Sequence, residues 1–266
     1  MAEIIAICNQ KGGVGKTTTA INLSAALAAA EKKTLLVDLD AQGNSTTGLG
    51  FDKHRIQHSI YNVLTGEVDI STVQMDTELG FLKMIPSNTA LVGAEVELVG
   101  FVSRETCLKK YLETVHHNFD YIIIDCPPSL GLLTLNALVA SDSVLIPVQC
   151  EYYAMEGIAD LQRTIQLVKG GLNKDLRIRG IILTMFDARN NLSRQVQSEI
   201  RNHFKDAVFQ VVIPRNVRLS EAPSHGKPIL LYDVTSKGAQ SYFELAKEVL
   251  AGSAATGQNN ATNCNY

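Results

Sequence analysis

The sequence contains no long apolar run, no paired-cysteine motif and no leader-like N-terminus. No apolar stretch approaches the roughly 18 residues of a membrane-spanning helix, so we expect no transmembrane segment. The five cysteines are odd in number, widely scattered and without a C-x-x-C pair, which argues against a disulfide framework or a zinc finger. The first residues lack the basic start and the cleavage site of a signal peptide. We therefore expect a cytosolic protein with reduced thiols and no membrane association.

Length and composition are those of an ordinary globular protein. The chain has 266 residues, which is near the upper size that one hydrophobic core supports. Hydrophobic residues make up 45% and charged residues 19%, which argues against disorder over most of the chain. Residues 251–266 are small and polar, with little to bury. We expect a single α/β domain over residues 1–250, followed by a disordered polar tail over residues 251–266.

The net charge of −3 conceals an uneven distribution along the chain. Residues 1–162 carry 10 basic and 19 acidic side chains, whereas residues 163–227 carry 12 basic and 5 acidic side chains. Such a basic segment can attract a polyanion to one face, and scattered solvated charge is the alternative. No helix-turn-helix, zinc motif or aromatic-rich surface is present to read bases. The segment therefore favours phosphate-backbone contacts without sequence preference.

Short β-branched runs alternate with longer helical patterns, which predicts βαβ units and a mainly parallel, twisted sheet with helices on both faces. The run YIIID is so uniformly apolar that both of its faces need cover, as in the middle of a parallel sheet. The predicted strands are Glu3–Cys8, Thr34–Asp38, Phe81–Ile85, Tyr121–Asp125, Ser143–Val148, Ile178–Thr184 and Val208–Ile213. The predicted helices are Lys16–Ala30, Arg104–His116, Met155–Val168, Leu192–Phe204 and Gly238–Leu250.

A glycine-rich segment, KGGVGKTT, joins the first predicted strand to the first predicted helix. Glycines let backbone N–H groups curl around phosphate oxygens, and the helix N-terminus adds positive potential. Lys16 can reach the β- and γ-phosphates of a nucleotide, and the Thr17 hydroxyl can ligate Mg²⁺. Gln10 replaces the usual first glycine of such loops, and Lys11 precedes the glycine pair. The predicted ATP contacts here are Lys11, Gly12, Gly13, Val14, Gly15, Lys16, Thr17 and Thr18.

Three carboxylates follow predicted strands. Asp38 and Asp40 end the second strand, and period-2 alternation places them on one side of it. Asp125 closes the apolar run IIID, where a Walker-B carboxylate holds Mg²⁺ through water. All three lie at the carboxyl ends of strands, where open α/β sheets bind ligands. We expect Asp125 to hold the metal through water and Asp38 to lie just outside its ligands.

Five segments together resemble the deviant Walker-A ATPases and, within them, the ParA/Soj partitioning family. These segments are KGGVGKTTT, VDLDAQGN, IIIDCPPSLG, PVQCEYYAMEG and IPRNVRLSEAPSHGKPI. The resemblance runs from Glu3 to about Leu250, nearly the whole chain. It implies a P-loop NTPase fold, a three-layer α/β sandwich that binds ATP and Mg²⁺ and hydrolyses ATP slowly unless stimulated by a partner.

The resemblance also implies roles for individual residues. Lys11 resembles the signature lysine that crosses an ATP-bound dimer to the partner's phosphates, which makes Lys11, Lys16 and Asp40 the expected catalytic residues. Asp40 matches the residue that orients the attacking water. The resemblance further implies that Met185, Pro214 and Asn216 contact the adenine. It implies that Arg189 and Arg218 contact DNA.

The implied function is partitioning of a chromosome or plasmid. In this cycle, ATP binding drives sandwich dimerisation and non-specific binding to double-stranded DNA. A ParB/Spo0J-like centromere-binding partner then stimulates hydrolysis and release. A cytoplasmic, nucleoid-associated bacterial protein is expected. The sequence does not distinguish a chromosomal from a plasmid origin.

Other functions of related ATPases remain as alternatives. A MinD-like membrane-positioning ATPase needs a C-terminal amphipathic helix, but residues 253–266 contain no Lys, Arg, Leu, Ile, Val or Phe. A nitrogenase iron-protein-like reductase needs cluster-bridging cysteines, and neither Cys107 nor Cys126 lies in such a motif. A regulator of replication initiation would use the same nucleotide switch, so sequence alone does not separate it from partitioning.

Overall fold

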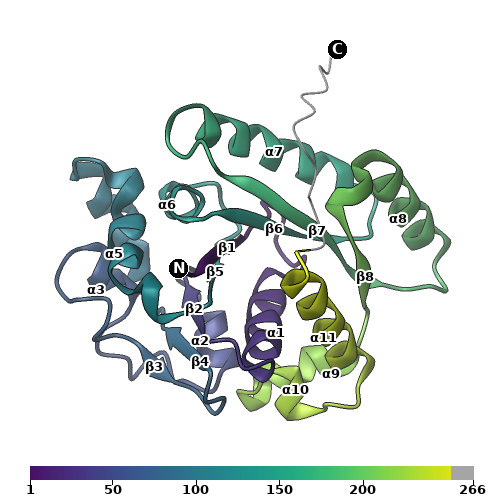
Figure 1. Cartoon of the computed structure of the whole chain (residues 1–266), viewed down its shortest axis with the longest axis horizontal. Coiled ribbons are helices and arrows are strands. Elements are labelled where there is room, and N and C mark those ends of the chain that lie inside the picture. Colours follow the sequence, from purple (N-terminus) through teal and green to yellow (C-terminus); the bar gives the residue numbers. More distant parts are fainter. Residues whose placement is uncertain (253–266) are drawn as a thin grey trace.

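The computed structural model describes residues 1–252, in which eight strands form one sheet of order β3-β4-β2-β5-β1-β6-β7-β8 (Figure 1). Every neighbouring pair is parallel except β3 and β4, which run antiparallel. The strands are β1 (Glu3–Ile7), β2 (Thr34–Asp38), β3 (Met75–Asp76), β4 (Leu82–Ile85), β5 (Tyr121–Asp125), β6 (Ser143–Gln149), β7 (Arg177–Phe186) and β8 (Val208–Pro214). The predicted mainly parallel sheet is confirmed, and only the two-residue β3, too short to show a periodic pattern, is additional.

The five predicted helices are present as α1 (Lys16–Ala29), α5 (Cys107–Val115), α7 (Ala154–Gly171), α8 (Asn191–Phe204) and α11 (Lys237–Leu250). Six more are α2 (Asn44–Gly48), α3 (Ile60–Leu64), α4 (Leu91–Glu97), α6 (Leu132–Ala140), α9 (Val217–Glu221) and α10 (Ile229–Tyr232). Short 3₁₀ helices cover Leu98–Gly100, Arg104–Thr106, His116–Asn118, Lys205–Ala207 and Ala222–His225. The sequence of α6, LLTLNALVA, is apolar on nearly every side, so it carries no 3.6-residue periodicity that predicts a helix.

Helices cover both faces of the sheet. In Figure 1, α1 and α11 lie below the sheet and α6 and α7 lie above it. Side chains from α3 to α8 pack into the core on one face, and side chains from α1, α9, α10 and α11 pack into the core on the other. The predicted three-layer α/β sandwich is therefore confirmed.

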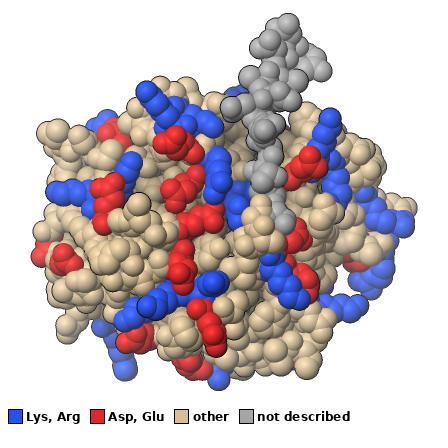
Figure 2. All heavy atoms as spheres, viewed as in Figure 1, with Lys and Arg blue, Asp and Glu red and all other residues tan. Residues whose placement is uncertain are grey.

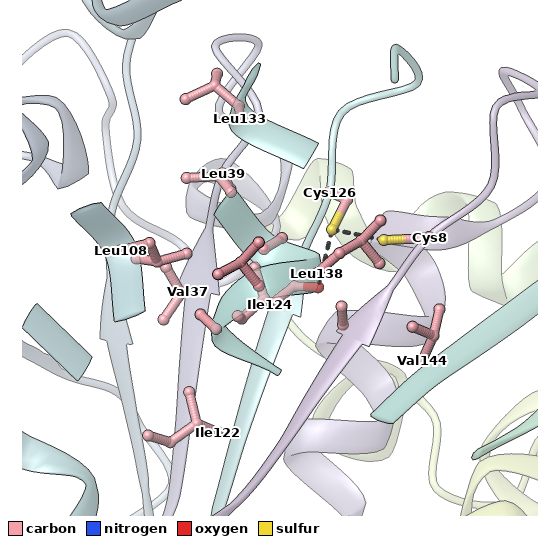
Figure 3. Packing of buried hydrophobic residues seen from close by; sticks show 14 of the residues in the cluster. Cys8, Val37, Leu39, Leu108, Ile122, Ile124, Cys126, Leu133, Leu138 and Val144 are labelled. Atoms are coloured by element: carbon pink, nitrogen blue, oxygen red, sulfur yellow. Dashed lines mark hydrogen bonds between the residues drawn. The ribbon is translucent and has the colours of Figure 1, made fainter. Parts of the chain in front are cut away.

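The central strands supply alternate residues to the two cores, as the period of two requires. In β5, Ile122 and Ile124 enter one core while Ile123 enters the other. Figure 3 shows Ile122, Ile124 and Val37 of neighbouring strands directed to the same side, against Leu108 and Leu138. Each strand is buried on both faces, which is why its sequence is uniformly apolar.

The parallel strands bring their carboxyl ends to one edge of the sheet. The loops that follow β1, β2, β5, β6, β7 and β8 therefore meet there. The predicted site residues lie in these loops, at the ends of the strands before them or in the first turns of the helices after them. The polar tail predicted from residue 251 lies, from residue 253 onward, outside the described residues. Across residues 1–252, no helix has both the length and the apolar character needed to cross a bilayer.

Candidate active site

The loop between β1 and α1 has the backbone geometry of a phosphate cradle. Gly13 and Gly15 adopt positive φ values of 75° and 87°, a conformation that side chains with a Cβ rarely take. No side chain caps the N-terminus of α1, and its first turn carries no acidic residue, so its free N–H groups favour an anion. The Thr184 hydroxyl donates to the Val14 carbonyl at 2.9 Å and fixes the loop against β7.

Two lysines of this loop point in different directions. Lys16 is buried, and its Nζ donates to the carbonyl of Lys11 at 3.1 Å. Burial lowers the pKa of Lys16, while the negative charge of Asp125 opposes this shift. Lys11 is half-buried and makes an ion pair across the loop with Glu151, 3.0 Å from Nζ to Oε2. Only Lys16 is therefore held within the glycine loop itself.

Asp38 is fully buried and pins the loop that follows β2. Its Oδ2 accepts hydrogen bonds from the backbone N and the hydroxyl of Thr46, at 2.8 and 2.7 Å. Its Oδ1 accepts from the backbone N of Asp40 at 3.2 Å. Burial raises the pKa of Asp38 to about 6. Asp38 thus shapes the loop that carries Asp40, and its expected position just outside the metal ligands stays a prediction.

Asp125 has one oxygen bonded and one oxygen free. The Ser45 hydroxyl donates to its Oδ2 at 2.7 Å, while its fully buried Oδ1 has no hydrogen-bond partner among the described residues. Burial, reinforced by the charge of Asp38, raises the pKa of Asp125 to about 7, and the nearby hydroxyl groups of Ser45 and Thr17 oppose this shift. An unpaired buried carboxylate oxygen close to a threonine hydroxyl fits a hydrated Mg²⁺ ion, because hard cations prefer oxygen ligands.

A cavity of about 340 Å³ opens beside the phosphate loop. Met185, Pro214 and Asn216 line it together with Gly15 and Thr18 of the loop, so the structure brings the three predicted base-contacting residues to one place. Met185 has a φ of 49°, an uncommon conformation for a residue with a side chain. The side chain of Asn216 accepts a hydrogen bond from the backbone N of Arg218 at 2.8 Å and so begins α9.

The two arginines predicted to contact DNA are exposed and each paired with acids, Arg189 in the loop between β7 and α8 and Arg218 in the first turn of α9. Arg189 holds Asp187 through two hydrogen bonds of 3.0 and 2.9 Å, and 90% of its side chain remains exposed. This arginine holds the pKa of Asp187 at about 2. Arg218 pairs with Glu221 at 2.9 Å and with Asp233 at 3.4 Å. Both guanidinium groups are fixed in position and still accessible.

The rest of the basic segment does not form a single patch. Arg179 is buried and donates to the carbonyl of Val249, and Arg177 pairs with Glu3 at 2.9 Å. On the face drawn in Figure 2, basic side chains stand at the right-hand edge, where Figure 1 places α8, while acidic ones cross the centre. Part of the basic excess is therefore structural and is not available to a polyanion.

The sequence did not point to four residues that shape this site. Asn9 accepts from the N–H of Lys11 at 3.0 Å and donates to the carbonyl of Pro147 at 2.7 Å. Ser45 and Thr46 bind the two buried carboxylates, and Glu151 binds Lys11. Two features of the sequence could have pointed to them. Asn9 is a polar residue that follows an apolar strand, and Ser45 and Thr46 are adjacent hydroxyl residues in the run GNST.

Comparison with known proteins identifies the family. A family model described as an AAA domain matches residues 2–178. The chain is 59% identical over 251 residues to the Bacillus subtilis sporulation initiation inhibitor protein Soj, covering 94% of this chain and 99% of that protein. It is 58% identical over 250 residues to the chromosome partitioning protein ParA of Myxococcus xanthus, covering 94% and 88%. The chain belongs to the Soj/ParA family of chromosome-partitioning ATPases.

A solved structure supports the same fold for this Soj/ParA protein. Cobyrinic acid a,c-diamide synthase from Mycobacterium smegmatis, crystallised with ADP and magnesium, aligns with a TM-score of 0.83 at 39% identity, covering 94% of each chain. The identity to Soj and ParA is higher, and neither of those names refers to a membrane or to replication. The predicted partitioning ATPase is thus confirmed in preference to a membrane-positioning protein or a replication regulator.

Proposed function

We propose that this Soj/ParA protein is an ATP-driven switch that binds DNA as a dimer and releases it after hydrolysis. The observation that carries the proposal is that Lys16 and Thr17 of the phosphate loop both lie near the Asp125 carboxylate, with a base-sized cavity beside the loop. Phosphoryl transfer needs positioning and charge neutralisation more than covalent chemistry, and these residues supply both.

ATP binds with its adenine in the cavity of Met185, Pro214 and Asn216 and its phosphates on the loop from Lys11 to Thr18. Lys16 neutralises phosphate charge. The residues that would hold Mg²⁺ are Thr17, directly, and Asp125, through water, with Asp38 supporting the loop behind them. When bound, Mg²⁺ offsets phosphate charge and orients the phosphate oxygens.

Asp40 orients the water that attacks the γ-phosphoryl group. Its Oδ1 accepts from the backbone N of Gln42 at 2.9 Å, and its own N–H binds Asp38, so the residue is held from two sides. No histidine or other strong general base contacts these carboxylates among the hydrogen bonds of the described residues. Basal hydrolysis is therefore slow, and a cation supplied by a second protomer can accelerate it.

Lys11 supplies that cation to the partner protomer in an ATP-bound sandwich dimer. Exposed Arg189 and Arg218, doubled by dimerisation, bind the phosphate backbone of double-stranded DNA without reading its sequence. A ParB/Spo0J-like centromere-binding protein stimulates hydrolysis and so resets the switch. This cycle places the protein in the bacterial cytoplasm, associated with the nucleoid.

Steady-state ATP hydrolysis across a wide range of protein concentrations tests the proposal. We expect turnover per protomer to rise with concentration until dimers saturate, because each site needs a partner's lysine. Lys11→Ala should abolish this rise, and Lys33→Ala, at the opposite edge of the sheet, should not change it. Turnover strictly proportional to protein concentration over the whole range would contradict the proposal.

A further inference from the structure

Lys11 is held by an acidic side chain of its own chain. Its Nζ lies 3.0 Å from Oε2 of Glu151, which follows β6. The other carboxylate oxygen of Glu151 accepts a hydrogen bond from the side-chain amide of Gln149, at the end of β6. Glu151 is thus oriented from one side and bound to Lys11 on the other.

The backbone of Lys11 is fixed to the same strand end. Asn9 accepts from the N–H of Lys11 and donates to Pro147 of β6, and the Nζ of Lys16 donates to the carbonyl of Lys11. The side chain is less firmly held, because 38% of the Lys11 side chain and 46% of the Glu151 side chain are exposed. Lys11 can therefore leave Glu151 without disturbing the loop backbone.

An ammonium group cannot at once keep a close pair with Glu151 and reach the phosphates of a second protomer. The pair is partly exposed to solvent and therefore weak enough to be exchanged, since such ion pairs contribute little net stability. The phosphates of a nucleotide offer Lys11 a denser negative charge than one carboxylate, so exchange toward them is favourable.

We infer that Glu151, oriented by Gln149, is a positioning residue that retains Lys11 within its own protomer and so competes with its action across the dimer. This inference rests on the trans role given to Lys11 in the proposed function. Glu151 then sets the threshold concentration for dimerisation, and with it the ATP-bound lifetime of single protomers.

Dimerisation of Glu151→Gln with a non-hydrolysable ATP analogue and Mg²⁺ tests the inference, for example by analytical ultracentrifugation. Neutralising Glu151 in both protomers should lower the midpoint concentration roughly 2- to 30-fold, since two pairs no longer need to break. Asp160→Asn, which removes the same charge from the exposed Asp160–Arg163 pair on α7, is the matched control and should leave the midpoint unchanged. In a Lys11→Ala background, Glu151→Gln should have no effect, because it acts only through Lys11.

Weaker dimerisation of Glu151→Gln, or an equal shift in the Lys11→Ala background, would overturn the inference. A second measurement needs no dimer: the rate at which acetic anhydride acetylates Lys11 in single protomers, followed by mass spectrometry. We expect Glu151→Gln to raise this rate up to about fivefold and Asp160→Asn to leave it unchanged. An unchanged rate would contradict the pair itself, whereas absence of wild-type dimers would instead contradict the proposed function.

Discussion

Neutralising the magnesium carboxylate should stabilise this protein while removing its activity. Asp125 is fully buried, its Oδ1 has no partner in the described part of the chain, and its pKa is raised to about 7 by burial and by Asp38. At neutral pH without Mg²⁺, the folded protein therefore holds this carboxyl partly protonated, and its ionised form is unfavourable compared with the unfolded chain. The substitution Asp125→Asn removes that charge and retains an oxygen that can accept from Ser45.

The size of the effect follows from the shift in pKa. A rise from the ordinary value to about 7 corresponds to roughly 4 kcal/mol at most, at about 1.4 kcal/mol per unit. Two effects of the substitution oppose this gain: the new amide N–H groups lack acceptors, and Lys16 loses a negatively charged neighbour. Together they lower the stability by about 1–3 kcal/mol. We expect a net stabilisation of about 1–3 kcal/mol, or roughly 2–12 °C in melting temperature.

The sign of the pH dependence distinguishes this account from a packing effect. Because the folded pKa of Asp125 is raised, the wild type loses stability as pH rises from about 4 to 7, whereas Asp125→Asn does not. Thermal melts with a chelator should therefore show Asp125→Asn no more stable than the wild type near pH 4, where the wild-type carboxyl is neutral, and more stable above pH 6. The exposed Asp76→Asn serves as the control. A variant that melts below the wild type at pH 8, or by the same margin at every pH, would refute the reasoning.

Three further substitutions have defined outcomes. Thr46→Val removes one of the three hydrogen bonds to the buried Asp38 carboxylate and leaves the buried N–H of Ser87 without its acceptor, so chemical denaturation should show a loss of about 2–4 kcal/mol. Gly226→Ala places a Cβ 2.6 Å from the facing backbone at a φ of 62°, and should cost about 2–4 kcal/mol by the same measurement. Arg189→Ala and Arg218→Ala should each reduce the slope of log K against log salt for duplex DNA by about 0.9 per lost phosphate contact, whereas Arg163→Ala should not. Unchanged stability would contradict the roles given to Thr46 and Gly226, and an unchanged salt slope would contradict the DNA contacts of Arg189 and Arg218.

The sheet and the phosphate loop were predictable because their signals are local. The run YIIID must be buried on both faces, and β5 is the strand between β2 and β1 in the structure. The loop from Lys11 to Thr18 combines glycines, a lysine and a hydroxyl within eight residues. No contact with a distant part of the chain is needed to interpret either feature.

The supporting contacts were not predictable, because they join residues far apart in the chain. Ser45 and Asp125 are 80 positions apart, and Lys11 and Glu151 are 140 apart. Before the fold is known, nothing distinguishes Ser45 from other loop serines or Glu151 from other exposed glutamates. Asp38 illustrates the same limit: its place at a strand end was evident, but its bonds to Thr46 and Asp40 required the structure.

The central claim is that Lys11 acts on the nucleotide of the partner protomer, and mixing two inactive variants tests it most directly. Lys11→Ala retains Asp40 but lacks the trans cation, and Asp40→Ala lacks the water-orienting carboxylate but can donate Lys11. In an equal mixture, half of the dimers are mixed and each has one complete site, so we predict about a quarter of wild-type turnover. Mixed dimers that form but hydrolyse ATP no faster than the two variants measured separately would contradict the account.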